Sequence, residues 1–176
     1  IGIAMNLFVS LDSNYIRPLC VMFKSIAATN SGNSFDIYVA YSSLTEDDFA
    51  MMEKALDGLD ARIHRVPVDD GIFSDAPVLN RLSKATYYRL LIGDILPDSV
   101  ERLLYLDPDI AVNGDLSEFY NTDLGDKIIA GCGHLYGFHE FINFARLGLK
   151  QKECIRYVNA GVLLIDLKKW RKAVTV

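Results

Sequence analysis

The segment ERLLYLDPD, residues 101–109, decides the fold of this chain. Its first six residues form a short, mainly apolar run, which is typical of a buried strand. The run ends at an acidic turn, Asp107-Pro108-Asp109. Because ligands bind beyond the carboxyl ends of parallel strands, a strand that ends in two carboxylates predicts a binding site at that edge of a sheet.

The rest of the chain alternates between short apolar runs and segments with helical spacing. Strands that alternate with helices of about 10 to 15 residues indicate an α/β sheet, mostly parallel and flanked by helices. Thr45 and Asp48 resemble a capping box that would begin the second helix. We expect strands at residues 5–11, 35–41, 61–68, 101–106, 127–132 and 157–165, and helices at 16–27, 45–59, 83–92 and 138–148.

The composition is that of a folded domain without a nucleic-acid partner. Of the 176 residues, 51% are hydrophobic and 23% are charged, and the net charge is −5. A chain of this length suits one domain and can bury about 70% of its unfolded surface. Binding to a phosphate backbone needs a basic surface, so we expect no nucleic acid among the partners.

Cysteine usage and hydropathy predict a cytoplasmic protein. Cys20, Cys132 and Cys154 form no CxxC pair and no zinc spacing, which favours a reducing compartment. No run approaches the roughly 18 apolar residues of a membrane span, and no basic segment precedes an apolar one at the N-terminus. Residues 1–4 precede Met5 and are interpreted as an addition to the native start, which leaves residues 5–176 as the domain.

Asp107 and Asp109 are the strongest candidates for metal ligands. Pro108 keeps Asp107 out of the helical region, and residues two apart in an extended backbone project to the same side. Paired carboxylates suit Mg²⁺ or Mn²⁺, which bind a few carboxylates and share the phosphates of a substrate. The other interpretation is a solvated acidic turn. A calcium-binding EF-hand is excluded, because Ala111 and Val112 stand where that loop needs a ligand and a glycine.

A second candidate segment, SLDSNY at residues 10–15, lies where the first strand meets the first helix. Asp12 and Asn14 can hydrogen-bond a base or a ribose, and Tyr15 can stack on a base ring. Neither a GxGxxG motif nor a P-loop motif occurs, so no glycine-rich loop cradles phosphates here. The alternative is that Asp12 or Asn14 only caps a helix.

Arg89 and residues 159–161 complete the candidate site. Arg89 lies in an otherwise apolar helix and forms either a buried salt bridge with the acidic turn or an arm to a diphosphate or donor sugar. Asn159, Ala160 and Gly161 place a polar side chain and two small residues early in a buried strand. Such a glycine marks the close approach of a ligand or of backbone, although a bulge or a tight packing contact needs the same residue.

Two further groups of polar residues are assigned structural roles. His64, His134 and His139 lack HxxxH spacing and an adjacent nucleophile motif, so each is interpreted as a surface histidine or one with an internal partner. The run KKWRK at residues 168–172 predicts a solvated helix face with Trp170 packed inward.

Taken together, four segments make the sequence similar to glycosyltransferase family 8. This family of retaining sugar transferases includes glycogenin and bacterial lipopolysaccharide galactosyl- and glucosyltransferases. The matching segments are residues 9–15, 85–90, 104–109 and 157–170, in the family's order and spacing. The resemblance implies a GT-A fold with a Rossmann-like, mostly parallel sheet, which binds a UDP-sugar together with Mn²⁺ or Mg²⁺.

The resemblance also implies roles for individual residues. Asp107 and Asp109 match the metal ligands, with Asp107 also on the donor-sugar or ribose side. Arg89 and Asn159 match donor-sugar contacts, while Ala160 and Gly161 leave room for the sugar ring. The nucleotide-sugar contacts expected in full are Ser10, Asp12, Asn14, Tyr15, Arg89, Asp107, Asn159, Ala160 and Gly161. Leu11 and Ser13 depart from the family's usual first loop, which bears on how the base packs.

The implied activity is transfer of glucose or galactose from a UDP-sugar to a saccharide or glycolipid acceptor, in lipopolysaccharide or cell-surface polysaccharide synthesis. Two other classes stay open: a nucleotide-sugar-binding domain without catalysis, and a receiver-like Mg²⁺-binding signalling domain. The signalling class is disfavoured, because it needs a phosphoacceptor Asp in mid-sheet and a later Lys.

Family members continue beyond the point that matches residue 176. They carry an acceptor-side motif with an Asp-Gln or similar pair, then a late His that completes the metal site and a Lys that holds the diphosphate. No histidine of this chain has such a context. We therefore expect that the C-terminal portion is missing, that it would mediate any peripheral membrane association, and that the 176-residue chain alone is inactive.

Overall fold

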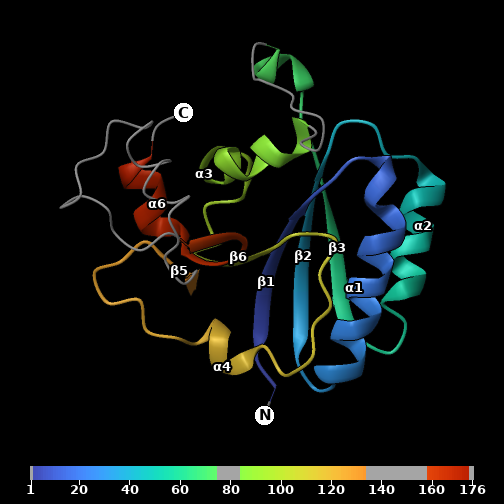
Figure 1. Cartoon of the computed structure of the whole chain (residues 1–176), viewed down its shortest axis with the longest axis horizontal. Coiled ribbons are helices and arrows are strands. Elements are labelled where there is room, and N and C mark those ends of the chain that lie inside the picture. The colour runs from blue at the N-terminus through green and yellow to red at the C-terminus, as the bar shows by residue number, and fades with distance from the viewer. Residues whose placement is uncertain (1, 75–83, 134–157, 175–176) are drawn as a thin grey trace, which may run out of the picture.

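The computed structural model describes residues 2–74, 84–133 and 158–174, which form a sheet flanked by helices (Figure 1). The six strands of the sheet lie in the order β3-β2-β1-β4-β6-β5. β6 is antiparallel to both of its neighbours and the other pairs are parallel, which confirms the predicted mostly parallel sheet. The strands are β1 Ala4–Ser10, β2 Ser34–Tyr41, β3 Asp60–Pro67, β4 Arg102–Leu106, β5 Ile129–Gly133 and β6 Val158–Asp166.

The helices follow their local sequence signals. Thr45 and Asp48 form the predicted capping box at the start of α2, where each side chain accepts a hydrogen bond from the backbone of the other residue. This helix ends earlier than expected, so Leu59 lies outside it. The helical elements are η1 Ser13–Tyr15, α1 Ile16–Thr29, α2 Glu46–Ala55, η2 Asp70–Phe73, η3 Lys84–Leu91, α3 Ile92–Ile95, α4 Ser117–Tyr120 and α6 Leu167–Ala173.

The helix expected at residues 83–92 is mainly a 3₁₀-helix, η3, followed by the short α3. Its buried residues are Ala85, Tyr88 and Leu91, which recur every third position. A 3₁₀-helix has three residues per turn, so this spacing places all three side chains on one face. The prediction of a helix here is confirmed for residues 84–92, and the structure adds its type, which the sequence analysis did not specify.

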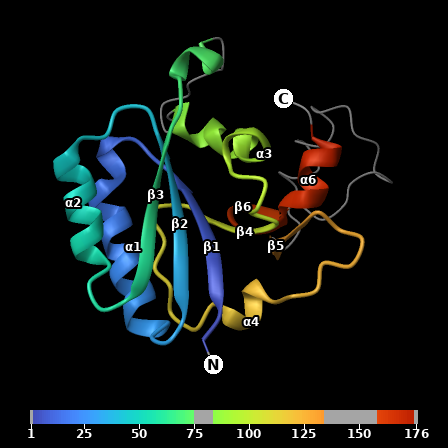
Figure 2. The same cartoon turned by 180° about the vertical axis from the view of Figure 1, so that it is seen from behind.

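Two apolar clusters cover the two faces of the sheet. On one face, α1 and α2 pack on Leu7 and Val9 of β1. On the other face, η3, α3 and α6 pack on Phe8 of β1 and Tyr105 of β4. Figures 1 and 2 show α1 and α2 together at one side of the molecule, and α3 with α6 at the other. The alternation of neighbouring β1 residues between the clusters is the period of two that a strand imposes.

The strand order places the candidate segments at one edge of the sheet. β1 and β4 are parallel neighbours, so residues 10–15 and the acidic turn leave the sheet at the same edge. β6 runs the other way and pairs Val162 with Leu106, so its first residues start where β4 ends. The antiparallel direction of β6 is therefore what brings residues 159–161 to the acidic turn.

Some predictions fall on residues that the structure does not describe. The expected helix at 138–148, together with His134, His139 and Cys154, lies outside the described residues. Among the helices of the described ranges, none combines the length and the apolar character that crossing a membrane requires.

Candidate nucleotide-sugar and metal site

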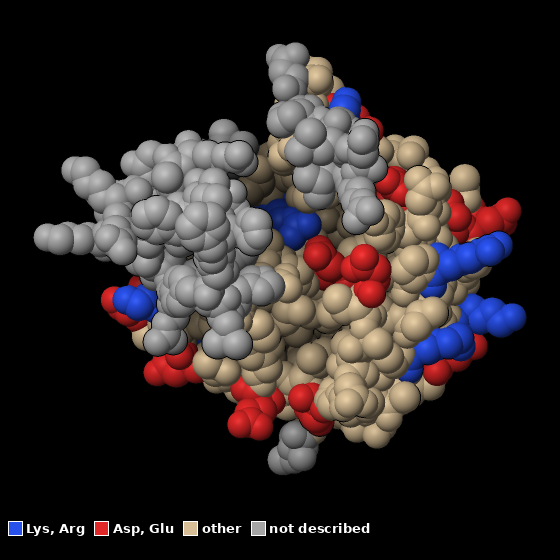
Figure 3. Space-filling view, in the orientation of Figure 1, with Lys and Arg blue, Asp and Glu red and all other residues tan. Residues whose placement is uncertain are grey.

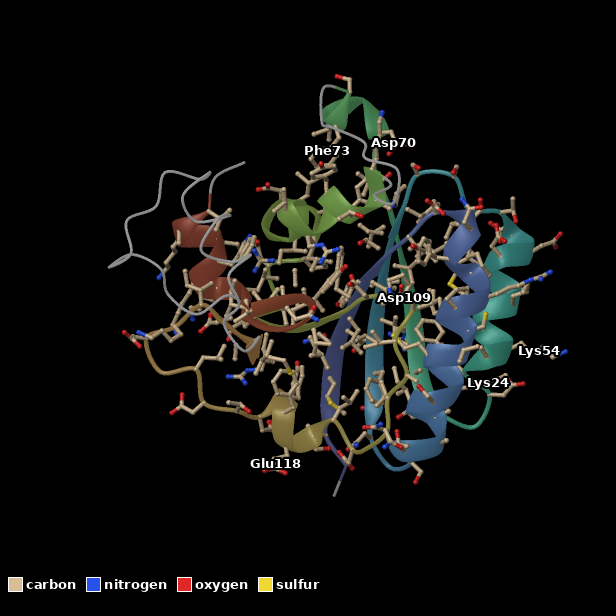
Figure 4. The ribbon with its side chains drawn as sticks, in the orientation of Figure 1. Lys24, Lys54, Asp70, Phe73, Asp109 and Glu118 are labelled. Atoms are coloured by element: carbon tan, nitrogen blue, oxygen red, sulfur yellow. The ribbon has the colours of Figure 1, made fainter. Side chains whose placement is uncertain are left out.

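A polar cavity of about 210 Å³ lies at the edge of the sheet where β1 and β4 end. The face in Figure 3 is hollowed near its centre, where a basic group and acidic groups lie close together. Figure 4 labels Asp109 near the centre of the same view, whereas Glu118 of α4 lies at the lower end of the molecule. The lining residues are Ser10, Leu11, Tyr15, Ala85, Thr86, Arg89, Tyr105, Asp107, Pro108 and Asp109.

Both carboxylates of the acidic turn line this cavity. The Asp107 backbone N–H donates to the carbonyl of Gly161 at 2.8 Å, so the turn is attached to β6 directly after β4 ends. Pro108 is buried and Asp109 is exposed. The two carboxylates therefore share a cavity wall, which goes beyond the interpretation as a freely solvated turn.

Arg89 joins η3 to the acidic turn and to β6. Its guanidinium donates from Nη2 to Oδ1 of Asp107 at 3.2 Å and from Nη1 to the carbonyl of Ala160 at 2.7 Å. Its Nε donates to the carbonyl of Thr86 at 2.9 Å. The Arg89 side chain is 18% exposed and pairs with the carboxylate of Asp107. The buried salt bridge that the sequence analysis gave as one of two interpretations of Arg89 is therefore present. A guanidinium carries five N–H groups, so one N–H on each terminal nitrogen has no partner among the described residues.

Gly161 lies close to the carboxylate of Asp107. A Cβ at this position would lie 2.5 Å from Oδ2 of Asp107 and 3.1 Å from Oδ1 of Asn159. The Gly161 backbone N–H donates to that same Asn159 oxygen at 2.8 Å. The close approach that the sequence predicted at this glycine is thus made by a side chain of the protein.

Tyr105 is a site residue that the sequence analysis missed. Its hydroxyl donates to Oδ1 of Asp107 at 2.5 Å, and the Arg89 guanidinium lies 4.4 Å from the centre of its ring. Burial, followed by the Asp107 carboxylate, raises the pKa of Tyr105, while Arg89 acts in the opposite direction. A signal was present, because the rule that placed Asp107 and Asp109 on one side of an extended backbone also places Tyr105 there.

Only some of the candidate residues in the loop at residues 10–15 line the cavity. Ser10 and Tyr15 line the cavity, while Asp12 and Asn14 do not. The carboxylate of Asp12 accepts a hydrogen bond from the Asn14 backbone N–H at 2.9 Å and caps η1. The capping role given as the alternative for Asp12 is therefore present.

Ser10 is 5% exposed, and its hydroxyl is the buried polar group without a hydrogen-bond partner among the described side chains. This hydroxyl lies near that of Tyr105 but lacks hydrogen-bond geometry with it. An unpaired buried hydroxyl costs stability, which makes it a candidate to pair with a ligand.

A second tyrosine–aspartate pair supports η3 from its other side. The Tyr88 hydroxyl donates to Oδ1 of Asp70 in η2, and Tyr88 is 1% exposed. Burial, with the hydrogen bond to Asp70 as the next cause, raises the pKa of Tyr88 to about 12. This contact fixes the helix that carries Arg89 against the segment that follows β3.

The residues that are present fit a divalent cation held by few protein ligands. Within the described ranges, no group of three or more His, Cys, Asp and Glu side chains is arranged to hold a metal ion. The cavity instead offers Asp107 and Asp109. Mg²⁺ is commonly held by one or two carboxylates, with waters and substrate phosphates completing its coordination. Two carboxylates beside a polar cavity match that donor set.

The remaining polar predictions are mixed in outcome. His64 pairs with Asp36 at 2.6 Å and stacks on Tyr38, which confirms an internally satisfied histidine. In α6, Trp170 packs against the second apolar cluster as predicted. Arg171 is not part of a solvated face, since its guanidinium donates to backbone carbonyls of residues 93, 96, 97, 98 and 100.

Comparison with known proteins identifies relatives along nearly the whole chain. The model of the family described as Glycosyl transferase family 8 matches residues 6–175. General stress protein A of Bacillus subtilis is 27% identical over 170 residues, which cover 96% of this chain and 58% of that protein. The Escherichia coli protein named lipopolysaccharide 1,2-glucosyltransferase is 28% identical over 170 residues, which cover 96% of this chain and 49% of that protein.

A solved structure supports the same relationship. The crystal structure of the galactosyltransferase LgtC, in complex with donor and acceptor sugar analogs, superposes on this chain with a TM-score of 0.85. It is 31% identical and the match covers 96% of this chain and 60% of LgtC. The match confirms the predicted GT-A fold. The chain spans about half of the length of the relatives with which it aligns.

Proposed function

Because the chain belongs to glycosyl transferase family 8, we propose that it contains the nucleotide-sugar-binding part of a metal-dependent hexosyltransferase. The whole protein would transfer glucose or galactose from a UDP-sugar to a saccharide acceptor with retention of anomeric configuration. Synthesis of bacterial lipopolysaccharide or another cell-surface polysaccharide is the proposed context. It is supported by the Escherichia coli relative named a lipopolysaccharide 1,2-glucosyltransferase and by the likeness to LgtC, described as a galactosyltransferase.

The observation that carries this proposal is the shared position of Asp107, Asp109 and Arg89 in one cavity. Two carboxylates and a guanidinium together suit a ligand that binds a divalent cation and is itself anionic, as a diphosphate is. The cavity lies at the carboxyl ends of β1 and β4, where open α/β sheets bind their ligands.

Asp107 and Asp109 are the proposed metal ligands. When bound, a Mn²⁺ or Mg²⁺ ion supplies positive charge that stabilises a diphosphate as it becomes a leaving group. Arg89 adds a second positive charge from η3, and its two N–H groups that have no partner in the described part of the chain suit a phosphate or a sugar hydroxyl. Because the guanidinium is anchored by three hydrogen bonds, it needs little reorganisation to bind an anion.

The uridine and the hexose are proposed to bind on opposite sides of the acidic turn. On the β1 side, Tyr15 offers a ring for stacking and the unpaired Ser10 hydroxyl offers a hydrogen bond. Asp12 and Asn14 contribute to this subsite from the neighbouring turn. On the β6 side, the donor sugar would face Asn159, Ala160 and Gly161. We assign residues 5–176 as a whole to one nucleotide-sugar-binding domain.

The test is turnover of UDP-glucose and UDP-galactose by the full-length protein, with and without Mn²⁺. We expect UDP release from one of the two donors, dependent on Mn²⁺, with a product that retains the anomeric configuration in its NMR spectrum. Mn²⁺-dependent UDP binding without turnover of either donor would favour the non-catalytic nucleotide-sugar-binding domain. Absence of any Mn²⁺-dependent UDP binding would contradict both assignments.

A further inference from the structure

The two carboxylate oxygens of Asp107 have different surroundings. Oδ1 accepts two hydrogen bonds, one from the Tyr105 hydroxyl at 2.5 Å and one from Nη2 of Arg89 at 3.2 Å. Within the described ranges, no donor reaches Oδ2. Oδ2 faces Gly161 of β6, where an added Cβ would lie 2.5 Å from it. The carboxylate is therefore held through one oxygen only.

Tyr105 is well placed to hold that oxygen rigidly. It is 1% exposed and its ring packs against Phe8 of β1, with the ring centres 6.1 Å apart. The same ring lies under the Arg89 guanidinium at 4.4 Å, so Tyr105 also supports the second donor to Oδ1. A carboxylate has no hydrogen to give, so the phenol must be the donor in this pair.

We propose that Tyr105 is a positioning residue that, together with Arg89, occupies Oδ1 of Asp107 and leaves Oδ2 as the oxygen that binds a divalent cation. The terminal torsion of an aspartate is broad and roughly two-fold, so a carboxylate without such a partner can turn and exchange its two oxygens. The Tyr105 hydroxyl removes that freedom before the cation arrives. The inference rests on the proposed function, because it concerns how Asp107 acts as a metal ligand.

The first experiment compares two buried tyrosines that each donate to an aspartate. Tyr105→Phe removes the hydroxyl and keeps the ring under Arg89, while Tyr88→Phe removes the hydroxyl that binds Asp70. Binding of Mn²⁺ is measured by the electron paramagnetic resonance of the free ion, and folding by thermal unfolding. We expect Tyr105→Phe to weaken Mn²⁺ binding about tenfold, as loss of a partner to a metal ligand commonly does. Tyr88→Phe can act on Asp107 only indirectly, through η3 and Arg89, so it should weaken Mn²⁺ binding less than Tyr105→Phe does, even if it lowers the melting temperature by the same amount.

A second variant tests the assignment of Oδ2 and does not depend on Tyr105. Gly161→Ala places a methyl group against Oδ2, whereas Gly114→Ala, the control, adds one in open space. Because the added Cβ must displace the Asp107 carboxylate, we expect Gly161→Ala to weaken Mn²⁺ binding and Gly114→Ala to retain it. Wild-type Mn²⁺ affinity in folded Gly161→Ala would overturn the assignment of Oδ2.

The outcomes separate this inference from the function on which it rests. Wild-type protein that binds no Mn²⁺, alone or with UDP, would overturn both. Wild-type protein that binds Mn²⁺ while Tyr105→Phe binds it equally well would overturn the positioning role and leave the proposed function intact. Equal losses in Tyr105→Phe and Tyr88→Phe would have the same meaning, because they would reflect general destabilisation.

Discussion

Asp12 shows how a residue that stabilises the fold can also support the proposed ligand site. Its carboxylate caps η1 by accepting the Asn14 backbone N–H, which holds the turn between β1 and α1. Tyr15, at the end of that turn, lines the cavity. A cap that fixes this turn therefore also fixes the ring proposed to stack on the base.

Two substitutions separate the roles of Asp12. Serine caps a helix about as well as aspartate but carries no charge, whereas alanine cannot cap. We expect Asp12→Ser to keep the wild-type melting temperature and to bind UDP several-fold more weakly. Asp12→Ala should lose UDP affinity and also about 1 kcal/mol of stability. Calorimetric UDP titration and thermal unfolding measure the two quantities, and wild-type UDP affinity in Asp12→Ser would reduce the residue to a cap.

Single residues also show where sequence reasoning stops. Asp107 and Asp109 were predicted as site residues because paired carboxylates follow the end of a strand, and Arg89 because it is a cation in an otherwise apolar helix. Tyr105 was missed because a tyrosine in a buried strand resembles any other core residue. The two-residue spacing already placed Tyr105 on the side of Asp107, but only the folded strand shows that its hydroxyl reaches that carboxylate.

Between elements, the hydrogen bond of Tyr88 with Asp70 helps to hold η3 against η2. It is expected to make stability fall at alkaline pH. The pKa of Tyr88 is about 12 in the folded protein against 10.0 for an unperturbed tyrosine. Between these values the unfolded chain loses this proton first, so the free energy of unfolding decreases as pH rises from about 10 to about 12. Below pH 10 both states hold the proton and the full contribution is present.

The prediction for Tyr88 compares the wild-type protein with Tyr88→Phe. At neutral pH the variant should lose about 1.5 kcal/mol of stability, the lower end of the range for a hydrogen bond to a charged group. Above pH 10 the difference between the two proteins should shrink. Denaturant unfolding at several pH values measures both effects, and a difference that stays constant up to pH 12 would contradict the assignment of this shift to Tyr88.

Arg171 connects α6 to residues 93–100, the segment that precedes β4. Its guanidinium donates to the carbonyls of Gly93, Leu96, Pro97, Asp98 and Val100. Arg171→Met keeps much of the aliphatic length and removes every one of these donors. We expect a loss of about 2 to 4 kcal/mol in the free energy of unfolding, since several charge-assisted hydrogen bonds disappear together.

The neighbouring Lys172 provides the matched control for this prediction. It is exposed on the same helix, and Lys172→Met should change stability by less than about 0.5 kcal/mol. Urea unfolding of both variants gives the comparison. Similar losses in the two proteins would mean that the carbonyl contacts of Arg171 contribute little.

The positions of the strands and helices could be predicted more often than the type of helix. Apolar runs located every strand of the described sheet, and the Thr45 capping box located the start of α2. The pitch of η3 was not predicted, because Ala85, Tyr88 and Leu91 fit either a 3₁₀-helix or one face of an α-helix over so short a stretch. The packing of η3 against the sheet decides between them.

At the scale of the whole molecule, the direction of β6 in the sheet could not be predicted from the sequence. An apolar run reads the same for a parallel and an antiparallel buried strand, so nothing local in residues 158–166 gives its direction. The direction matters for function, because it brings Gly161 beside Asp107 and Ala160 beside Arg89. Expecting ligand-binding residues only at the carboxyl ends of strands would have placed this segment at the wrong edge.

The whole-molecule claim is that β1, η3, β4 and β6 together form a UDP site that depends on a divalent cation. Calorimetric titration of UDP into the 176-residue chain, with and without Mn²⁺, tests it most directly. Asp109→Asn removes a proposed metal ligand, and Asp98→Asn makes the same change at an exposed position away from the cavity. The account predicts that UDP binds only with Mn²⁺ present, that Asp109→Asn abolishes this binding, and that Asp98→Asn retains it. UDP affinity that is the same with and without Mn²⁺ would contradict this account. So would a folded Asp109→Asn variant that binds UDP as tightly as the wild type.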